Sequence, residues 1–328
     1  MILFYRRIVL CCAALFCLLS VGLAGAQDEP DTGFLGETFI IYAAAPLTDL
    51  DGSYFATLYT LDADGSRPLI NTDGNQFSNN CGDYSAANQR VLFESTRANN
   101  GSSGYVHAEL YSVDFNDTRR LRRLTFTDMD ETAPRWSPDG TRLVYMAGTD
   151  TNDTGTYEIY IMDADGDKVR QLTDNDSADR YPTWSPDGQR IIFHSNRDGD
   201  YELYTMLADG SDVQALTDNR REDARAAYAP DGARIAFNAG ALEDLDDLFV
   251  IDADGRNAQQ LTDTPDLLEF GAVWSPDGAQ IAYTVWEGFD DLTAEIWVMN
   301  ADGSDARRLF GDDNTDYGIC DWAALEGG

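Results

Sequence analysis

The chain has 328 residues, of which 43% are hydrophobic and 11% aromatic, and 58 acidic against 23 basic residues give a net charge of −35. This composition supports a packed core and excludes a largely disordered chain. The acidic excess repels nucleic acid and anionic lipid headgroups, so neither is expected as a partner, and it attracts cations and basic protein surfaces. Solubility is the simpler explanation of the charge, and a specific acidic binding role is the alternative.

The first 26 residues have the pattern of a signal peptide. Arg6 and Arg7 precede an apolar run over 8–24, and the small-x-small cleavage site Ala24-Gly-Ala26 follows. Cleavage after Ala26 predicts a mature chain exported to the periplasm, the cell envelope or the extracellular space, with a net charge of −37 because both arginines leave. An uncleaved anchor is the alternative, since an apolar run of 17 residues is near the lower limit for a bilayer-spanning helix. After cleavage, no stable membrane insertion is expected.

Three short apolar segments follow a linker over 27–37. They cover 38–43, 56–61 and 67–70, and we expect them to form strands two, three and four of a four-stranded unit. The first strand of that unit is missing from this part of the sequence.

A seven-residue phrase then recurs. Four full copies ending in Pro-Asp-Gly begin at Pro134, Pro182, Ala226 and Ala272, and degenerate copies occur at 82–88 and 320–324. The aromatic residue of each copy marks the register, at Tyr84, Trp136, Trp184, Tyr228, Trp274 and Trp322. The spacings are 52, 48, 44, 46 and 48 residues, a period that suits one four-stranded propeller blade.

Three further strands are predicted after each full copy. Apolar second strands begin at Arg142, Arg190, Arg234 and Gln280, just after the Asp-Gly hairpin signal. Third strands cover 157–162, 201–206, 247–251 and 295–299, and each leads to an Asp-Gly turn. Short fourth strands end at 171–173, 215–217, 260–262 and 308–310.

The last segment, 317–324, predicts a first strand with nothing after it. It complements the incomplete first unit, so we expect it to pair with 38–43 and to close a ring without open edge strands. The predicted fold is therefore all-β, a six-bladed propeller of four-stranded antiparallel blades over 38–328, and we expect a monomer.

Two cysteines, Cys81 and Cys320, remain after removal of the signal peptide. Both fall on innermost strands of neighbouring blades at nearly the same level, and an exported protein meets oxidising conditions. We therefore expect a Cys81–Cys320 disulfide that stabilises ring closure.

The Trp-Ser-Pro-Asp-Gly phrase, the apolar run behind it and the Ala-Asp-Gly turn resemble the PD40 family of WD40-like repeats, best known from the propeller of TolB. The resemblance covers roughly 38–324. It implies a periplasmic propeller whose channel mouth docks a partner protein or peptide. TolB carries an α/β domain before its propeller, to which the resemblance does not extend, so it does not imply the role of TolB in a Tol-Pal system.

An acidic residue lies five positions before the register aromatic in four repeats, at Glu131, Asp179, Asp223 and Glu269. Asp316 lies one position further back in its repeat, and Asn79 occupies the equivalent place in another. Since each enters an innermost strand, we expect the six to ring one channel mouth and to bind a cation or a basic or polar peptide segment. The alternative is that they cap loops through hydrogen bonds to nearby backbone N–H groups.

Signals of metal binding and catalysis are weak. Asp-rich turns at 62–65, 163–166 and 252–255 lack the bidentate Glu of a calcium loop, so turn formation explains them better. The absence of a Gly-x-Ser-x-Gly motif disfavours a serine peptidase. His107 and His194 lack metal-ligand spacing, which argues against a histidine-rich lyase site, and His194 fits the end of a second strand. The repeated tryptophans fit blade packing better than sugar stacking.

We therefore expect a non-enzymatic scaffold that binds a protein or peptide in the cell envelope. No cofactor or resident metal is predicted, and a divalent cation at the acidic mouth stays open. The rival is an envelope hydrolase or lyase that acts on polysaccharide or peptide, with clustered carboxylates as acid and base or as metal ligands.

Overall fold

The computed structural model of the chain describes residues 35, 37–46, 56–70, 78–98, 107–149, 157–240, 247–286 and 293–324, apart from the side chain of Cys81. The predicted signal peptide over 1–26 and most of the linker over 27–37 lie outside the described residues. Within the described ranges the structure contains strands and turns but no helix, so nothing there has the length and hydropathy of a bilayer-spanning helix.

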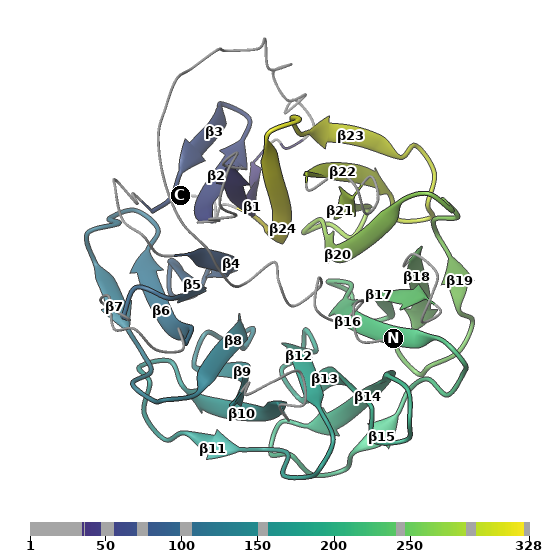
Figure 1. The fold of residues 1–328 in the computed structure, drawn as a ribbon, viewed down its shortest axis with the longest axis horizontal. Coiled ribbons are helices and arrows are strands. Elements are labelled where there is room, and N and C mark those ends of the chain that lie inside the picture. The colour runs from purple at the N-terminus through teal and green to yellow at the C-terminus, as the bar shows by residue number, and fades with distance from the viewer. Residues whose placement is uncertain are drawn as a thin grey trace.

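The strands form sheets that are arranged around a common centre (Figure 1). Six strands lie nearest the centre: β4 (Asn79–Ser85), β8 (Asp130–Trp136), β12 (Asp179–Trp184), β16 (Glu222–Tyr228), β20 (Leu268–Trp274) and β24 (Thr315–Ala324). The second strands are β1 (Thr38–Pro46), β5 (Arg90–Ser95), β9 (Arg142–Gly148), β13 (Arg190–Ser195), β17 (Arg234–Gly240) and β21 (Gln280–Trp286).

The third and outermost strands complete each group. The third strands are β2 (Thr57–Asp62), β6 (Glu109–Asp114), β10 (Tyr157–Asp163), β14 (Glu202–Leu207), β18 (Asp247–Asp252) and β22 (Ala294–Asn300). The outermost are β3 (Gly65–Pro68), β7 (Leu121–Arg123), β11 (Arg170–Gln171), β15 (Gln214–Ala215), β19 (Gln259–Gln260) and β23 (Arg307–Phe310).

Four of the outermost strands, β3, β11, β15 and β19, end earlier than the sequence predicts, whereas β23 ends at Phe310 as predicted. The Leu-Thr pair expected inside the fourth strand lies just beyond β11, where Leu172 N donates to Ile159 O at 2.7 Å. The Thr173 hydroxyl then accepts a hydrogen bond from Ile159 N at 2.9 Å, in place of a backbone carbonyl. Thr217 and Leu203 repeat this side-chain bond at 2.9 Å. A threonine hydroxyl therefore ends the ladder.

Sixteen of the strands form four separate antiparallel sheets of four, and the other eight form one sheet. In that sheet, β24-β1-β2-β3 is joined to β20-β21-β22-β23 by a single parallel pair, Ala294 and Asp316. The C-terminal β24 runs antiparallel to β1 from the Thr38–Ala324 pair to the Pro46–Thr315 pair. The predicted pairing of the last strand with the first unit is confirmed, and it covers what would be an open edge of β1.

The repeated phrase follows from the geometry of its turn. The turn glycines Gly140, Gly188, Gly232 and Gly278 have φ between +67° and +70°, a region that favours glycine. In three copies the serine hydroxyl donates to the aspartate carboxylate, as from Ser185 Oγ to Asp187 Oδ1 at 2.6 Å. The same hydroxyl accepts the N–H that opens the second strand, Arg190 N, at 2.9 Å. Serine, aspartate and glycine thus each have a defined task.

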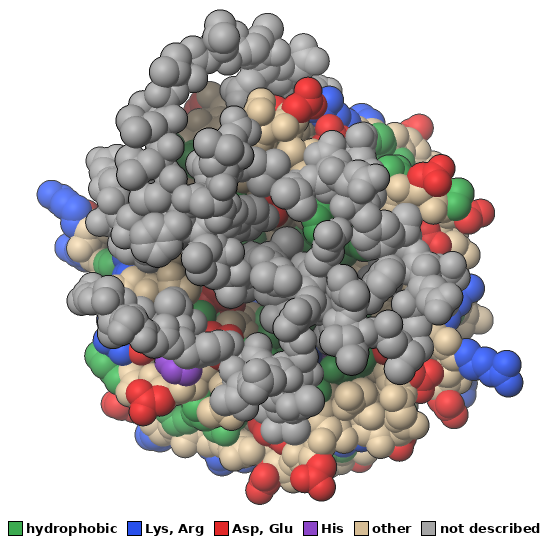
Figure 2. Space-filling model, viewed as in Figure 1, with side chains coloured by type: hydrophobic (Ala, Val, Ile, Leu, Met, Phe, Trp, Pro, Cys, Tyr) green, Lys and Arg blue, Asp and Glu red, His purple; other side chains and the backbone are tan. Residues whose placement is uncertain are grey.

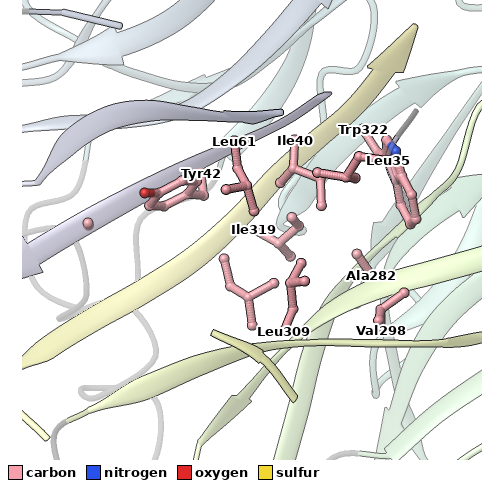
Figure 3. Packing of buried hydrophobic residues seen from close by; sticks show 11 residues of the cluster. Leu35, Ile40, Tyr42, Leu61, Ala282, Val298, Leu309, Ile319 and Trp322 are labelled. Atoms are coloured by element: carbon pink, nitrogen blue, oxygen red, sulfur yellow. The ribbon is translucent and has the colours of Figure 1, made fainter. Parts of the chain in front are cut away.

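Apolar side chains fill the spaces between sheets. One cluster joins Ile40 of β1 and Ile319 of β24 to Val298 of β22, and Figure 3 shows Ile319 in the middle of it. The register tryptophans Trp136, Trp184, Trp274 and Trp322 are each buried in such a cluster, as predicted. Burial of each large side chain stabilises the fold by about 1.5–3 kcal/mol, so contacts between sheets supply much of the stability.

Candidate functional site: a central cavity between the innermost strands

The six residues predicted to ring a channel mouth lie at the starts of the innermost strands, as expected, but five of them are buried. Asn79, Glu131, Asp179, Asp223 and Glu269 are 0–2% exposed. Asp316 is partly exposed and pairs with Ala45 of β1. The expected open ring of six is therefore corrected: the structure leaves Asp316 accessible and places the other five inside the fold.

The buried members hold the loops that lead into their own strands. Asp179 accepts hydrogen bonds from Arg197 Nη2 at 2.9 Å on both carboxylate oxygens, and from Asn175 Nδ2 at 2.8 Å. Asp223 accepts from Asn219 Nδ2 at 2.6 Å. The donor lies four residues before the acid in both loops, which is a local capping arrangement.

The other blades repeat this arrangement with different donors. Thr127 Oγ1 donates to Glu131 Oε1 at 2.5 Å, and the hydroxyl of Thr264 binds Glu269. In β4, the Asn79 side-chain oxygen accepts from the hydroxyl of Ser95 at 2.8 Å and from Arg97 at 2.5 Å. The loop-capping alternative describes these residues, with side-chain donors in place of the expected backbone N–H groups.

Burial changes the acidity of these carboxyls. It raises the pKa of Glu131, of Asp223 and of Glu269 to about 7, against the hydrogen bonds from their loop donors, which act in the opposite direction. At neutral pH these groups are partly protonated. Because they are also buried in their own loops and absent from the cavity wall, they are poorly placed to focus negative charge on a partner.

A cavity of about 450 Å³ lies between the innermost strands, and we call it the central cavity. Residues of β4, β8, β12, β16, β20 and β24 line it. Of the six residues predicted from the sequence, its described wall includes Asp316 alone. A concave site shared by several sheets is the usual place for ligand binding.

A β-bulge interrupts every innermost strand. The register shifts between Asn80 and Asp83, Thr132 and Arg135, Arg180 and Thr183, Ala224 and Ala227, and Phe270 and Val273, and opposite Ile41–Tyr42 in β24. In four strands a bulge residue has positive φ: Ala133 (+50°), Tyr181 (+49°), Arg225 (+53°) and Gly271 (+70°). All four line the central cavity. Positive φ is strained for tyrosine and arginine, and such strain gathers at functional sites.

A side chain of the preceding sheet accepts a hydrogen bond from the bulge N–H or its equivalent. The pairs are Ala133 N to Glu94 Oε2 (2.9 Å), Tyr181 N to Met146 Sδ (3.4 Å), Arg225 N to His194 Nδ1 (3.3 Å), Gly271 N to Asn238 Oδ1 (3.3 Å) and Ile319 N to Thr284 Oγ1 (3.0 Å). Each acceptor lies ten positions after a register aromatic and directly after three apolar residues. Of these acceptors the sequence pointed only to His194, as the end of a second strand, although the variable position after three apolar residues was a visible signal in all five.

Two arginines and three aromatic rings form one part of the cavity wall. The Arg225 guanidinium lies 4.6 Å from the ring centre of Tyr181 and 5.4 Å from that of Phe270, and it donates to the Tyr181 hydroxyl at 3.3 Å. The Arg180 guanidinium lies 5.0 Å from the ring centre of Tyr157. Rings that face a guanidinium stabilise its charge and fix its position.

A buried histidine lies behind this arginine cluster. His194 is on β13, near the end of a second strand as predicted, and its ring stacks on Tyr181 with centroids 5.3 Å apart. Burial lowers the pKa of His194 well below its ordinary value, and the charges of Arg180 and Arg225 lower it further. The imidazole is therefore neutral, and the positive charges of both guanidinium groups lie close to it.

Carboxyls lie on another part of the wall. Asp83 Oδ2 accepts a hydrogen bond from Trp136 N at 2.5 Å, and Asp321 Oδ2 accepts from Tyr84 N at 2.9 Å. Burial raises the pKa of Asp83 to about 7 and also that of Asp321, while the charge of Arg135, 3.7 Å from Asp83 Oδ1, opposes both shifts. The cavity thus carries groups of both signs, in place of the uniformly acidic mouth expected from the sequence.

The predicted disulfide joins two strands that are neighbours, since Asp321 of β24 binds the backbone of Tyr84 in β4. Cys320 is buried on β24, and its Sγ lies 3.6 Å from Gly318 O. The side chain of Cys81 lies outside the described residues. The Cys81–Cys320 bond stays a prediction.

The Asp-rich turns use their carboxylates within the turn, as the turn interpretation predicts. Asp62 Oδ1 accepts from Asp64 N at 2.9 Å, and Asp254 Oδ1 accepts from Arg256 N at 3.2 Å. In the described part of the chain, no three His, Cys, Asp or Glu side chains are grouped so as to hold a metal ion. Figure 2 shows other Asp and Glu side chains spread around the periphery of one face, with basic side chains among them, which suits the solubility interpretation of the charge.

Known proteins share both the repeat and the fold of this chain. A family model described as "TolB beta propeller domain" (PD40) matches residues 38–246, more than half of the chain. The curated Tol-Pal system protein TolB of Anaeromyxobacter dehalogenans (strain 2CP-C) is 56% identical over 43 residues, which are 13% of this chain and 9% of that protein.

Two solved structures show how widely the fold is used. TolB from Acinetobacter baumannii matches with a TM-score of 0.68 and 21% identity, over 87% of this chain and 66% of that one. An oligogalacturonate lyase in complex with manganese matches with a TM-score of 0.53 and 15% identity, over 82% of this chain and 74% of the lyase. The match therefore spans less than two thirds of either TolB relative, and at these identities the solved structures share the fold alone.

Proposed function

Because the chain belongs to the TolB β-propeller family, we propose that it is an exported, non-enzymatic scaffold of the cell envelope that binds a protein or peptide segment in its central cavity. The observation that carries the proposal is the cavity itself, about 450 Å³ in volume and lined by all six innermost strands. Its wall offers aromatic rings, arginines and carboxyls, which together suit a peptide better than a single ion.

The proposal includes the finer architecture. The six groups of four strands close into a six-bladed ring, with the β24–β1 pairing as the closure and the parallel Ala294–Asp316 pair as a contact between two blades. The chain acts as a monomer after cleavage of its signal peptide behind Ala26. Equilibrium sedimentation and the N-terminal sequence of the secreted chain test these points, and a dimer or a retained leader would contradict them.

Site-specific crosslinking tests the binding function. A photoreactive benzoylphenylalanine replaces Phe270, which lies in the cavity wall, and in a matched variant it replaces Phe126, which is 72% exposed and outside that wall. After irradiation of intact cells, we expect a covalent adduct with one envelope protein from position 270 and none of that adduct from position 126. The crosslinked peptide is identified by mass spectrometry. Equal adducts from both positions, or none from position 270, would contradict binding in the cavity.

We also propose the Cys81–Cys320 disulfide, because their strands are adjacent and the exported chain meets oxidising conditions. Alkylation of the secreted protein under denaturing conditions, with and without prior reduction, measures it. Two extra alkyl groups after reduction would support the bond. Equal masses would exclude it.

One observation supports an enzyme as second candidate. Asp83 and Asp321 are buried carboxyls with raised pKa in the cavity wall, an environment in which one carboxyl acts as acid and another as base. A screen of polysaccharides and peptides, with and without a divalent metal, tests this candidate. Turnover that Asp83→Asn abolishes would place the enzyme ahead of the scaffold. Asp179, by contrast, is buried against Arg197 and does not belong to the described cavity wall.

A further inference from the structure

Charged side chains of both signs line the central cavity. Arg180 of β12 and Arg225 of β16 line one side, and Asp83 of β4 with Asp316 and Asp321 of β24 line the other. Arg135 of β8, 3.7 Å from Asp83, and the acids Glu94 and Asp130 also belong to the wall. Figure 1 shows β24 across the centre from β12, and β4 across from β16. Two cationic side chains of neighbouring strands therefore lie opposite a group of acids, an arrangement that the net charge of the chain does not reveal.

The Arg225 guanidinium is held in place before any ligand arrives. Tyr181 and Phe270 face it at 4.6 and 5.4 Å, and the Tyr181 hydroxyl accepts one of its N–H groups at 3.3 Å. The backbone of Arg225 has positive φ, and its N–H is held by His194. A fixed, planar guanidinium loses little conformational freedom when it binds a carboxylate through two N–H groups.

Arg180 lies in the same part of the cavity wall as Arg225. Both Arg180 and Arg225 lower the pKa of the buried His194, so both positive charges lie near this imidazole. Arg180 precedes Tyr181, the ring that faces Arg225, and all three residues line the central cavity. An anion bound at this part of the wall would be attracted by both positive charges.

We propose that Arg180 and Arg225 form a carboxylate-binding subsite, which holds an acidic side chain or the C-terminal carboxylate of a peptide segment bound in the central cavity. The subsite specifies which group of the ligand the cavity binds, and it rests on the proposed function. Aromatic rings beside the two guanidinium groups would pack against the aliphatic part of the same residue. The acids across the cavity would bind a basic group of the segment.

The mixed charges of the cavity wall favour a peptide over an acidic polysaccharide. A peptide carries charges of both signs and can match both sides of the wall. A polyuronate carries a carboxylate on each sugar, and those beyond the subsite would meet Asp316, Asp321 or Asp83. Like-charge contacts of that kind select against the wrong ligand.

The test uses peptides whose charge is varied at one position. An array of synthetic heptapeptides, each with one acidic and one basic residue, is probed with the full-length secreted protein. For the tightest peptide, the dissociation constants of the Glu and Gln (or Asp and Asn) forms are measured by fluorescence anisotropy. We expect the acidic form to bind the wild-type protein at least about tenfold more tightly, since a charge-assisted pair is worth more than about 1.4 kcal/mol. In Arg180→Gln and Arg225→Gln, this preference should fall to about twofold or less.

Two further variants keep the test decisive. Arg170→Gln removes the same charge from the exposed outer strand β11, and it should leave the preference unchanged. Arg225→Lys keeps the charge but loses the planar fork, so it should retain part of the preference even if Arg225→Gln fails to fold. Thermal unfolding checks the fold of each variant.

The outcomes separate the subsite from the function. Peptide binding with a preference that both glutamine variants retain would overturn the subsite but leave the peptide-binding scaffold. Failure of every peptide to bind would overturn both. Trigalacturonate serves as the saccharide probe, and binding of trigalacturonate in an Arg225-dependent manner, without peptide binding, would assign the subsite to a uronate and overturn the proposal.

Discussion

The turns of the blades and the bulges of the innermost strands are both repeated around the molecule, but they differ in how uniform they are. At the turns, three of the four full copies make the same side-chain bond, as in the 2.6 Å contacts Ser137–Asp139 and Ser275–Asp277. At the bulges the geometry repeats while the residues change, so that Ala133 and Arg225 occupy equivalent places. The residues that are the same in each turn therefore indicate what the fold requires. The residues that differ between equivalent bulges indicate positions where the chain can acquire a function without loss of the fold.

We use the word framework for the strands of the blades and the turns and loops that join them. If this comparison is right, the largest loss of stability should come from removing a part of the framework that no other part can replace. Deletion of 315–328 removes β24 and with it the antiparallel partner of β1 and the cluster around Ile319 and Trp322. We expect loss of cooperative thermal unfolding and aggregation through the edge of β1. Deletion of 325–328, which leaves β24 intact, should preserve the transition. A cooperative monomer after the longer deletion would show that β24 is not part of the framework.

Replacement of a turn glycine by alanine should cost more stability where neighbouring atoms leave less space for a methyl group. A methyl group at Gly255 (φ +81°) would lie 2.5 Å from Leu216 O, a backbone atom that cannot rotate away. At Gly188 (φ +67°) the nearest atom is Pro138 Cδ at 3.7 Å. We expect Gly255→Ala to cost about 3 kcal/mol in the free energy of unfolding and Gly188→Ala about 1 kcal/mol, the backbone strain alone. Urea denaturation measures both, and equal losses would refute the steric explanation.

The buried acids of the loops belong to the framework and should make stability depend on pH. Burial raises the pKa of Glu131 to about 7 in the folded chain, above its usual value of about 4.5 in the unfolded chain. Between these values the folded chain binds more protons than the unfolded one, so stability is full below about pH 4.5 and falls as pH rises through 7. Glu131→Gln should remove about 2 kcal/mol of the loss between pH 5 and 8. Urea midpoints at a series of pH values test this, and an unchanged pH slope would contradict it.

The sequence was sufficient for the framework because the framework is uniform. The register aromatic and the Pro-Asp-Gly turn repeat, so the strand order and the pairing of β24 with β1 could be predicted. The acid ring could not be judged in the same way, since Asp179 enters an innermost strand whether its side chain faces the cavity or, as here, its own loop at Asn175. The position of a residue in the repeat predicts where it lies along the strand. It does not predict whether its side chain points into the cavity or toward the loop before the strand.

The bulges could not be predicted from the sequence for a different reason. In a regular strand, consecutive residues point to opposite faces, so Arg180 and Tyr181 would not both be expected in one cavity wall. The bulge inserts an extra residue and brings both to that wall. A two-residue period read from the sequence does not reveal such an insertion, and the positive φ of Tyr181 has no signal of the kind that a glycine provides.

The smallest effects are expected where one bulge is compared with another. Thr284 Oγ1 is buried and accepts Ile319 N at 3.0 Å, whereas at the equivalent place Met146 Sδ accepts Tyr181 N at 3.4 Å through a weaker sulfur acceptor. Thr284→Val keeps the shape and removes the acceptor, so it should cost about 1 kcal/mol in the free energy of unfolding, and Met146→Leu should cost less than about 0.5 kcal/mol. Urea denaturation of the two variants resolves this difference when their m-values agree. Because the two acceptors occupy equivalent positions in their strands, equal costs would mean that the chemical identity of the acceptor does not affect stability. The variation at these positions would then carry no information about the cavity.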